Sequence, residues 1–340
     1  MTTAPRAYAI TPAHDLVTLG RATSQMIAPG APTPDPPPDF GEIRTPTPGA
    51  LSTAPPVLRY VFHNAVVHGP QGAITVGRHV VAESLGHTPA PFAIQHGALW
   101  MTRHDYIGTS LSEAEHLLCA VPANYFHWML DGYARRVALP LKHAPILLPG
   151  TGAPFQPIPN ARLIVDGESI AVTRLGWSTT LTSNGGAYHP VILDLPKPAP
   201  NGPPDLYIAR TDATNRPLRN EAAIQNLCES RGFTPVTLAG MTLTDQAALF
   251  AAARRIIAPH GAGLANLIFC AKGTAVLELM MDQYANFCFR RLAATAALRW
   301  GAVIGHAESG NPDWIHRTAW SLDPDRLSAV LDDPAFTLCP

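Results

Sequence analysis

Residues 256–269 read IIAPHGAGLANLIF, and this stretch decides the fold. Its apolar start predicts a buried strand that ends at His260. A Gly-Ala-Gly turn at 261–263 then opens a helix. Small residues at such a turn let an anion approach the backbone, and the first helical turn offers unpaired N–H groups. The stretch therefore predicts the carboxyl end of a strand in an α/β sheet, where such sheets bind ligands.

Strands and helices alternate on both sides of this stretch. The predicted strands are 206–210, 234–238, 256–261 and 274–280, and the predicted helices are 220–232, 244–255, 262–270 and 285–298. Asn220 fits the N-cap of the first of these helices. Strands that alternate with helices of this length are typical of βαβ units and a parallel sheet.

The sequence divides into four parts. Residues 1–56 are rich in proline and alanine, which predicts an extended or irregular lead-in, either packed as a strand arm or loose. Residues 57–198 begin with short strands and predict an α/β domain, bounded by the proline-rich stretch LPKPAPNGPPD (195–205). Residues 199–310 hold the alternating pattern, and residues 311–340 predict a tail with a short helix.

Composition argues against several classes of protein. A net charge of −1 with 14% charged residues argues against a large nucleic-acid footprint, which needs clustered Lys and Arg. No stretch reaches the roughly 18 apolar residues of a membrane helix, and the start lacks the pattern of a signal peptide. The cysteines form no C-x-x-C pair, which favours reduced thiols. We expect a cytoplasmic protein, and a peripheral contact with the inner face of a membrane stays open.

Charged residues follow the neighbouring strands at the same predicted edge. Arg210 ends the strand 206–210, and Arg216 follows in the next loop. A guanidinium group matches two phosphate oxygens at once. Glu278 lies near the end of the strand 274–280, where a carboxylate can accept hydrogen bonds from ribose hydroxyls. Solvated surface charges, and tight helix–sheet packing at the Gly-Ala-Gly turn, are the structural alternatives.

A second pair of polar residues lies in NYFHWMLDGYARR (124–136). His127 and Asp131 are four positions apart, so they share one face of a helix. The carboxylate could orient the imidazole as a general base, or Asp131 could itself be the base. The alternative is an ion pair between Asp131 and Arg135, with Asn124 as the helix N-cap. The pattern is not H-E-x-x-H, so no metal site is predicted.

Three segments together resemble glycosyltransferase family 61, in its bacterial polysaccharide-biosynthesis type. They are NYFHWMLDGYARR, LYIARTDATNRPLRNE and IIAPHGAGLANLIFCAKGTAVLEL, in that order. The resemblance implies a GT-B architecture, in which two Rossmann-like domains face each other across a cleft. It implies an inverting enzyme with a nucleotide-sugar donor, most often a UDP-sugar, and a glycan or lipid-linked saccharide as acceptor. The products would be surface polysaccharide or lipopolysaccharide.

The resemblance also implies roles for single residues. The C-terminal half would bind the donor through Arg210, Arg216, Asn220, His260, Gly261, Ala262, Gly263, Asn266 and Glu278. The N-terminal half would bind the acceptor, with Asp131 or His127 as the base. Because the arginines and the helix N-terminus stabilise the charge on the leaving diphosphate, neither a metal nor a cofactor is expected.

Two other readings compete with this one. The Gly-x-Gly turn also suits a dinucleotide-dependent oxidoreductase, although Asn266 replaces the third glycine of that fingerprint and the turn lies late in the chain. A glycan-binding protein that has lost its chemistry is the second alternative. Binding of UDP rather than NAD separates the transferase from the first, and measurable transfer separates it from the second.

Overall fold

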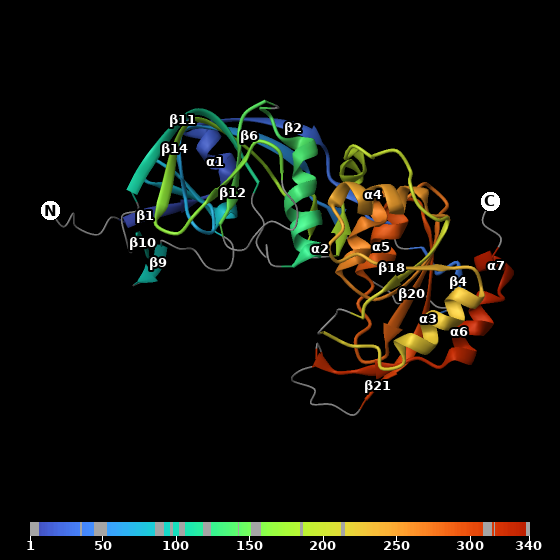
Figure 1. Cartoon of the computed structure of the whole chain (residues 1–340). Coiled ribbons are helices and arrows are strands. Elements are labelled where there is room, and N and C mark those ends of the chain that lie inside the picture. The colour runs from blue at the N-terminus through green and yellow to red at the C-terminus, as the bar shows by residue number, and fades with distance from the viewer. Residues whose placement is uncertain are drawn as a thin grey trace. The chain divides into compact units, whose positions relative to one another are not determined.

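The computed structural model describes most of the chain, and Figure 1 labels its elements. The described residues are 7–34, 36–43, 53–85, 92–95, 98–101, 106–117, 124–141, 143–150, 158–183, 186–211, 215–308, 315 and 317–337. The chain forms two compact units, unit 1 (Met1–Gly30 and Pro55–Thr182) and unit 2 (Ala31–Ala54 and Ser183–Pro340). The mixed α/β class predicted from the sequence is confirmed, although strands outweigh helices among the described residues.

Unit 1 is built on a curled mixed sheet (Figure 1). Its strands are β1 (Ala7–Thr11), β2 (Ala22–Ala28), β6 (Val57–His68), β7 (Ala73–Val76), β8 (His79–Val81), β9 (Phe92–Gln95), β10 (Ala98–Met101), β11 (Tyr106–His116), β12 (Ile146–Pro149), β13 (Ala161–Ile164) and β14 (Glu168–Ser178). They follow the order β13-β12-β11-β14-β6-β7-β8-β1-β10-β9, and β2 also pairs with β6. The first four strands of this order are parallel, whereas β6 is antiparallel to β14.

The core of unit 1 lies against one face of this sheet. Phe62 of β6 and Trp177 of β14 have ring centroids 6.2 Å apart. Leu16 of the short helix α1 (Ala13–Thr18) is fully buried in the same cluster. Burying one large apolar side chain contributes about 1.5–3 kcal/mol. Such contacts hold α1 on the sheet.

The sequence predicts an extended or irregular lead-in over 1–56, and its residues 7–28 contain β1, α1 and β2. For 57–198 the sequence predicts an α/β domain that begins with short strands, and the described residues form strands with short helical turns. The physical reason is visible in β6, where buried residues are interspersed with partly buried ones and the strand pairs directly with β14, β2 and β7.

The segment predicted as one helix from Asn124 is broken into three turns. It consists of α2 (Tyr125–His127), the π-helical turn η2 (Trp128–Gly132) and the 3-10 helix η3 (Tyr133–Ala138). Asn124 is the N-cap, and its side chain accepts from the Phe126 N–H at 2.9 Å. Gly132 favours a helix less than most residues. Beyond it, buried Arg135 donates to the Ser178 carbonyl, so η3 is held to the end of β14.

Unit 2 contains the parallel sheet that the alternating pattern predicted. Its strands are β4 (Phe40–Gly41), β17 (Asp205–Ala209), β18 (Thr234–Thr237), β19 (Arg255–Pro259), β20 (Ala275–Met281), β21 (Arg299–Ala307) and β22 (Trp320–Ser321). The helices are α3 (Glu221–Ser230), α4 (Leu243–Ala252), η5 (Ala262–Phe269), α5 (Cys288–Thr295), α6 (Pro324–Leu331) and α7 (Pro334–Thr337). Unit 1 also contains the short helix η1 (Ala82–Ser84). The remaining short elements of the chain are β3 (Ala31–Pro32), β5 (Thr53–Ala54), β15 (Thr182–Ser183), β16 (Ala187–Tyr188) and η4 (Pro190–Asp194).

The strand order of unit 2 is β18-β17-β19-β20-β21, all parallel. Helices α3 and α6 pack on one face of this sheet, and α4, η5 and α5 pack together on the other (Figure 1). In chain order this is the arrangement 2-1-3-4-5 of doubly wound sheets of the flavodoxin type. Antiparallel β22 and the short parallel strand β4 both pair with β21.

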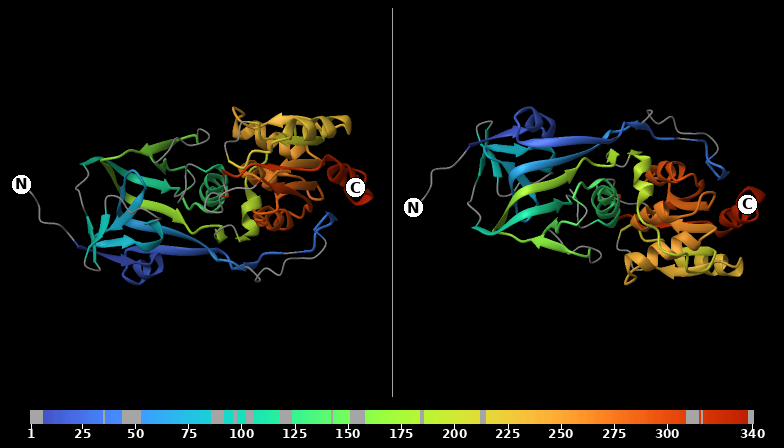
Figure 2. Two further views of the ribbon diagram at one scale, coloured as in Figure 1. Left: turned by 90° about the horizontal axis from the view of Figure 1, so that it is seen from below. Right: turned by 90° about the horizontal axis from the view of Figure 1, so that it is seen from above.

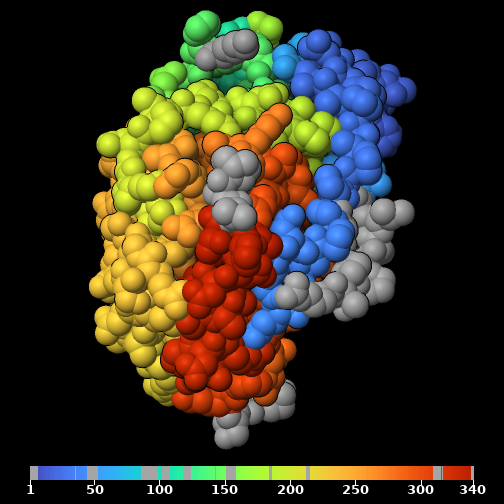
Figure 3. All heavy atoms as spheres, turned by 90° about the vertical axis from the view of Figure 1, so that its right-hand side faces the viewer, coloured from blue at the N-terminus to red at the C-terminus, as the bar shows by residue number. Residues whose placement is uncertain are grey.

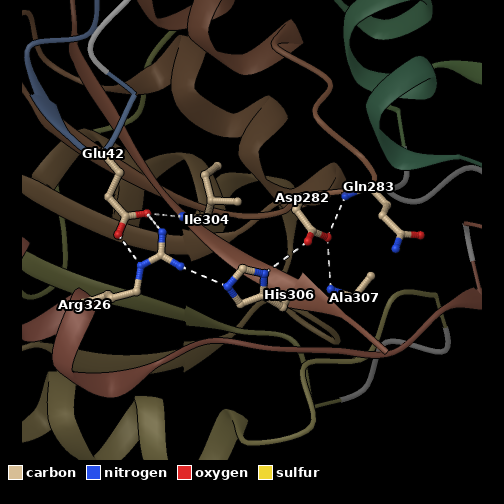
Figure 4. Close-up of polar contacts among 7 residues, drawn as sticks. All are labelled: Glu42, Asp282, Gln283, Ile304, His306, Ala307 and Arg326. Carbon is tan, nitrogen blue, oxygen red and sulfur yellow. Dashed lines mark hydrogen bonds and ion pairs between the residues drawn. The ribbon is translucent and has the colours of Figure 1, made fainter. Parts of the chain in front are cut away.

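Residues 36–43 belong to unit 2, where β4 completes an edge of the sheet. Figures 2 and 3 show this blue stretch running along the orange and red part of the chain. Phe40 is 1% exposed and contacts Phe336 at a ring-centroid distance of 5.0 Å. Glu42 accepts from Arg326 at 2.6 and 2.7 Å and from the Ile304 N–H at 2.8 Å (Figure 4). This part of the predicted lead-in is therefore integral to unit 2.

The proline-rich stretch 195–205 also differs in role from the prediction. It lies inside unit 2, since the two units divide after Thr182. Lys197 donates to the Cys270 carbonyl at 3.1 Å, and the Asn201 N–H donates to the Ala248 carbonyl at 3.0 Å. Prolines rule out a helix here, but the remaining polar groups find partners along α4 and η5.

Candidate functional site

The strand order marks one point of unit 2 as a candidate ligand site. Strands β17 and β19 are neighbours, yet the chain continues from β17 to β18 on one side and from β19 to β20 on the other. Doubly wound sheets bind ligands at the carboxyl ends of strands where the order reverses in this way. The residues that directly follow these two strands are Arg210 and His260.

Arg210 lies against the backbone of the 260–261 turn. Its Nη1 donates to the His260 carbonyl at 2.7 Å, and its Nη2 donates to the Asn215 carbonyl at 3.3 Å. A Cβ atom at Gly261 would lie 2.8 Å from Arg210 Nε, which is closer than ordinary contact. The absence of a side chain at Gly261 therefore gives the guanidinium its place at the strand end.

The imidazole of His260 forms a hydrogen bond with the buried carboxylate of Glu278. His260 Nδ1 lies 2.5 Å from Glu278 Oε1, and Glu278 Oε2 accepts from Trp300 Nε1–H at 2.8 Å. Because an ionised carboxylate can only accept, Nδ1 is the donor in this pair. Among the described residues, His260 Nε2 has no hydrogen-bond partner. The pair thus fixes the tautomer and leaves Nε2 for other chemistry.

Glu278, which the sequence predicts as a contact of ribose hydroxyls, is a buried residue. Its residue surface is 0% exposed, and its oxygens accept hydrogen bonds from His260 and Trp300. In this structure its carboxylate therefore orients the His260 ring.

Arg216 lies over an aromatic ring beside His260. Its guanidinium carbon is 4.4 Å from the Tyr284 ring centroid, and burial lowers the pKa of Arg216. The His260 ring contacts Tyr284 at 5.4 Å and Phe289 at 5.1 Å between centroids. Two cationic side chains therefore lie near His260. Arg210 donates to its backbone carbonyl, and Arg216 lies on the Tyr284 ring that contacts its imidazole.

Two predicted binding residues, Asn220 and Asn266, make hydrogen bonds within unit 2. Asn220 donates to the Leu322 carbonyl at 2.6 Å and accepts from the Leu322 N–H at 3.2 Å, so its side chain ties α3 to the C-terminal region. It occupies the N-cap position but makes no side-chain cap bond. Asn266 is 0% exposed and donates to Gln246 and to the Gly263 carbonyl.

The rest of the predicted turn is half-exposed. Ala262 is the first residue of η5, and a Cβ at Gly263 would lie 2.7 Å from Leu238 Cδ1. The second glycine thus serves packing of helix against sheet, which was the structural alternative. The backbone at 261–263 stays next to Arg210 and His260.

Sequence reasoning missed several residues of this site. Trp300 and Tyr284 carry no local motif, and only the fold brings them to Glu278 and His260. Glu221 is buried and accepts from the Arg210 N–H at 2.5 Å and from the Tyr207 hydroxyl at 3.3 Å. Its place directly after Asn220, at the first position of a predicted helix, was the available signal.

Unit 1 contains the second predicted pair. His127 Nδ1 lies 2.6 Å from Asp131 Oδ2, and the Thr182 hydroxyl donates to Asp131 Oδ1. The His127 and Asp131 side chains are 34% and 22% exposed. The alternative ion pair of Asp131 with Arg135 is not what the structure shows, because the Arg135 guanidinium lies 4.8 Å from the Trp177 ring centroid and donates to Ser178.

Metal-binding clusters and membrane-spanning helices are both absent from the part of the chain that the structure describes. Within it, no group of three or more His, Cys, Asp or Glu side chains is arranged to hold a metal ion. Within the same residues, no helix has both the length and the apolar character to cross a membrane.

Residues 125–277 match the family model of glycosyltransferase 61. This match supports the family resemblance seen in the sequence. It spans His127, Asp131, Arg210, Arg216 and His260 and ends one residue before Glu278. No curated protein matches the chain.

Proposed function

We propose that this protein is an inverting glycosyltransferase that works without a metal ion. It would transfer a sugar from a nucleotide-sugar, with a UDP-sugar as the expected donor, to a hydroxyl of a glycan or lipid-linked saccharide. The reaction would serve surface polysaccharide or lipopolysaccharide synthesis, in the cytoplasm or at the inner face of the membrane. The match to glycosyltransferase 61 supports the reaction class, and the site in unit 2 supports an anionic donor.

One observation carries the donor assignment. The Arg210 guanidinium lies on the side-chain-free backbone of Gly261, next to His260, at the strand ends where doubly wound sheets bind ligands. A diphosphate is stabilised by positive charge and by close approach of the backbone, and this turn offers both. Arg216, on the neighbouring ring of Tyr284, adds a second positive charge.

The proposed chemistry is a single displacement. The acceptor oxygen attacks the anomeric carbon while the bond from that carbon to the diphosphate breaks, and its electron pair stays with the leaving group. Arg210, Arg216 and the backbone N–H groups at 261–263 would stabilise that charge, which grows only as the bond breaks. Glu278 and Trp300 hold the His260 ring in place. The proton of the acceptor hydroxyl goes to the His127–Asp131 pair.

Calorimetric titration tests the donor assignment. We expect UDP and UDP-sugars to bind and to raise the melting temperature, while NAD and NADP do neither. Stabilisation by NAD without any effect of UDP would overturn the proposal in favour of an oxidoreductase. UDP binding without transfer or donor hydrolysis would favour the glycan-binding alternative.

Metal independence has its own test. Transfer measured in excess EDTA should proceed at the rate found without the chelator. Activity that disappears with EDTA and returns with Mn²⁺ or Mg²⁺ would refute this part of the proposal and leave the transferase assignment standing.

A further inference from the structure

The His127–Asp131 pair of unit 1 belongs to a longer chain of hydrogen bonds. Asp131 Oδ1 accepts from the hydroxyl of Thr182, which is only 4% exposed. Thr182 Oγ1 also lies 3.3 Å from Thr180 Oγ1. The single hydroxyl hydrogen of Thr182 is used on Asp131, because the carboxylate can only accept. Thr180 must therefore be the donor to Thr182.

This direction of donors places a hydrogen on Nδ1 of the His127 imidazole. Asp131 Oδ2 takes its hydrogen bond from His127 Nδ1–H at 2.6 Å. Both carboxylate oxygens of Asp131 are thus engaged, one by a buried hydroxyl and one by the ring. A neutral imidazole with its hydrogen on Nδ1 carries a lone pair on Nε2. Among the described residues, His127 Nε2 has no hydrogen-bond partner.

The backbone around Asp131 is shaped for this contact. The π-helical turn η2 spans Trp128–Gly132, and π turns are frequent at functional sites because they re-aim side chains. On the C-terminal side, Arg135 holds η3 to the end of β14. Thr182 follows the same strand by four residues, so one strand end anchors both sides of the turn.

We propose that His127 Nε2 is the proton acceptor of the transfer reaction and that Asp131 and Thr182 are positioning residues for it. This inference rests on the proposed function. The proton moves from the acceptor hydroxyl to Nε2 as that oxygen bonds to the anomeric carbon and the diphosphate leaves. Of the two alternatives that the sequence left open, the geometry assigns the imidazole, since its outer nitrogen is the unengaged atom.

Four variants separate the roles. A general base contributes roughly 10²–10⁴-fold to the rate, so His127→Gln should lower kcat by that amount. Asp131→Asn should lower kcat comparably, because an amide can donate to Nδ1 and move the hydrogen to Nε2. Thr182→Val should lower kcat about tenfold with unchanged UDP affinity, and Thr182→Ser should restore it.

A matched control exists on the surface of unit 2. His306 Nδ1 lies 3.2 Å from Asp282 Oδ2, and the His306 side chain is 72% exposed (Figure 4). His306→Gln removes an imidazole with the same kind of carboxylate partner, and kcat should not change. UDP affinity, measured for every variant, shows whether unit 2 remains folded.

Nitrogen-15 NMR of the resting protein gives a readout that a merely structural role would not move. The His127 signals, assigned by their loss in His127→Gln, should show a protonated Nδ1 and an unprotonated Nε2. A hydrogen on Nε2 in the wild type would overturn the assignment. So would a His127→Gln variant that keeps kcat within threefold while the wild type binds UDP and transfers sugar. A wild type that neither binds UDP nor transfers sugar would instead refute the proposed function.

Discussion

Replacing Gly261 with alanine probes the link between the strand-end turn and Arg210. The backbone itself accepts the change, because Gly261 has φ −179° and ψ 165°, an extended conformation open to any residue. The new methyl group would lie 2.8 Å from Arg210 Nε and 3.0 Å from Cζ, whereas ordinary contact begins near 3.4 Å. The guanidinium must therefore retreat by about 0.6 Å, the difference between the first and last of these distances.

The size of the effect follows from the hydrogen bond that this retreat strains. Arg210 Nη1 donates to the His260 carbonyl at 2.7 Å, and the shift lengthens that bond toward the limit of useful geometry. A hydrogen bond to a charged group contributes about 1.5–3 kcal/mol, and 1.4 kcal/mol corresponds to a tenfold change in affinity. Complete loss of Arg210 as an anion donor would weaken UDP binding roughly 10- to 150-fold. We expect Gly261→Ala to weaken it by about 3- to 30-fold.

Calorimetric titration with UDP on four proteins tests this reasoning. They are the wild type, Gly261→Ala, Arg210→Ala and the double variant, with Arg219→Ala as a control for an exposed arginine of the same loop that pairs with Glu308. If the methyl group acts through Arg210, Gly261→Ala should add little in the Arg210→Ala background. Fully additive losses, or UDP affinity unchanged in Gly261→Ala, would refute the proposed role of this turn.

Three further predictions follow from buried groups. Glu278→Gln leaves one acceptor oxygen for two donors, so urea unfolding should show a loss of about 1–3 kcal/mol and calorimetry should show weaker UDP binding; unchanged values in both would remove Glu278 from the site. Burial raises the pKa of Glu115 to about 7, so the native protein holds a proton there between about pH 4.5 and 7 that the unfolded chain releases. The contribution of Glu115 to the free energy of unfolding therefore falls as pH rises through that window, by up to about 1.4 kcal/mol per pH unit. Over the same range, the free energy of unfolding of Glu115→Gln should rise relative to that of the wild type. Parallel curves of this free energy against pH for the two proteins would contradict the prediction. Phe40→Ala should cost about 3–5 kcal/mol in thermal or urea unfolding, and a loss below 1 kcal/mol would mean that β4 does not stabilise unit 2.

The parallel sheet of unit 2 was predictable because its signals are local. Each strand and helix of residues 205–298 is marked by its own apolar pattern, and caps such as Thr242, which accepts from the Asp245 N–H at 3.1 Å, lie next to the helices they start. Unit 1 was not predictable in this way. Its long strand β6 pairs with β14 through partners such as Phe62 and Leu175, and nothing near either residue specifies the other.

The same contrast between local and long-range signals applies to the candidate site. Arg210 and His260 follow adjacent strands, so topology alone brings them to one edge. The direction of Glu278 depends on Trp300, which belongs to another strand, and a strand-end carboxylate looks the same in sequence whether it points to solvent or inward. Thr182 had no signal at all, because its contact with Asp131 joins residues 51 positions apart.

The long sequence separation between β4 and its hydrogen-bond partners has a consequence for biosynthesis. Asp39 accepts from the Trp300 N–H across 261 positions, and Glu42 meets Arg326 across 284. The ribosome therefore releases the short strand β4 long before its partner β21 exists. A nascent chain stalled before residue 299 would carry a sheet edge with no neighbour, the kind of surface that invites aggregation and chaperone binding. The sheet of unit 2 is therefore completed only after β21 (Arg299–Ala307) has been synthesised.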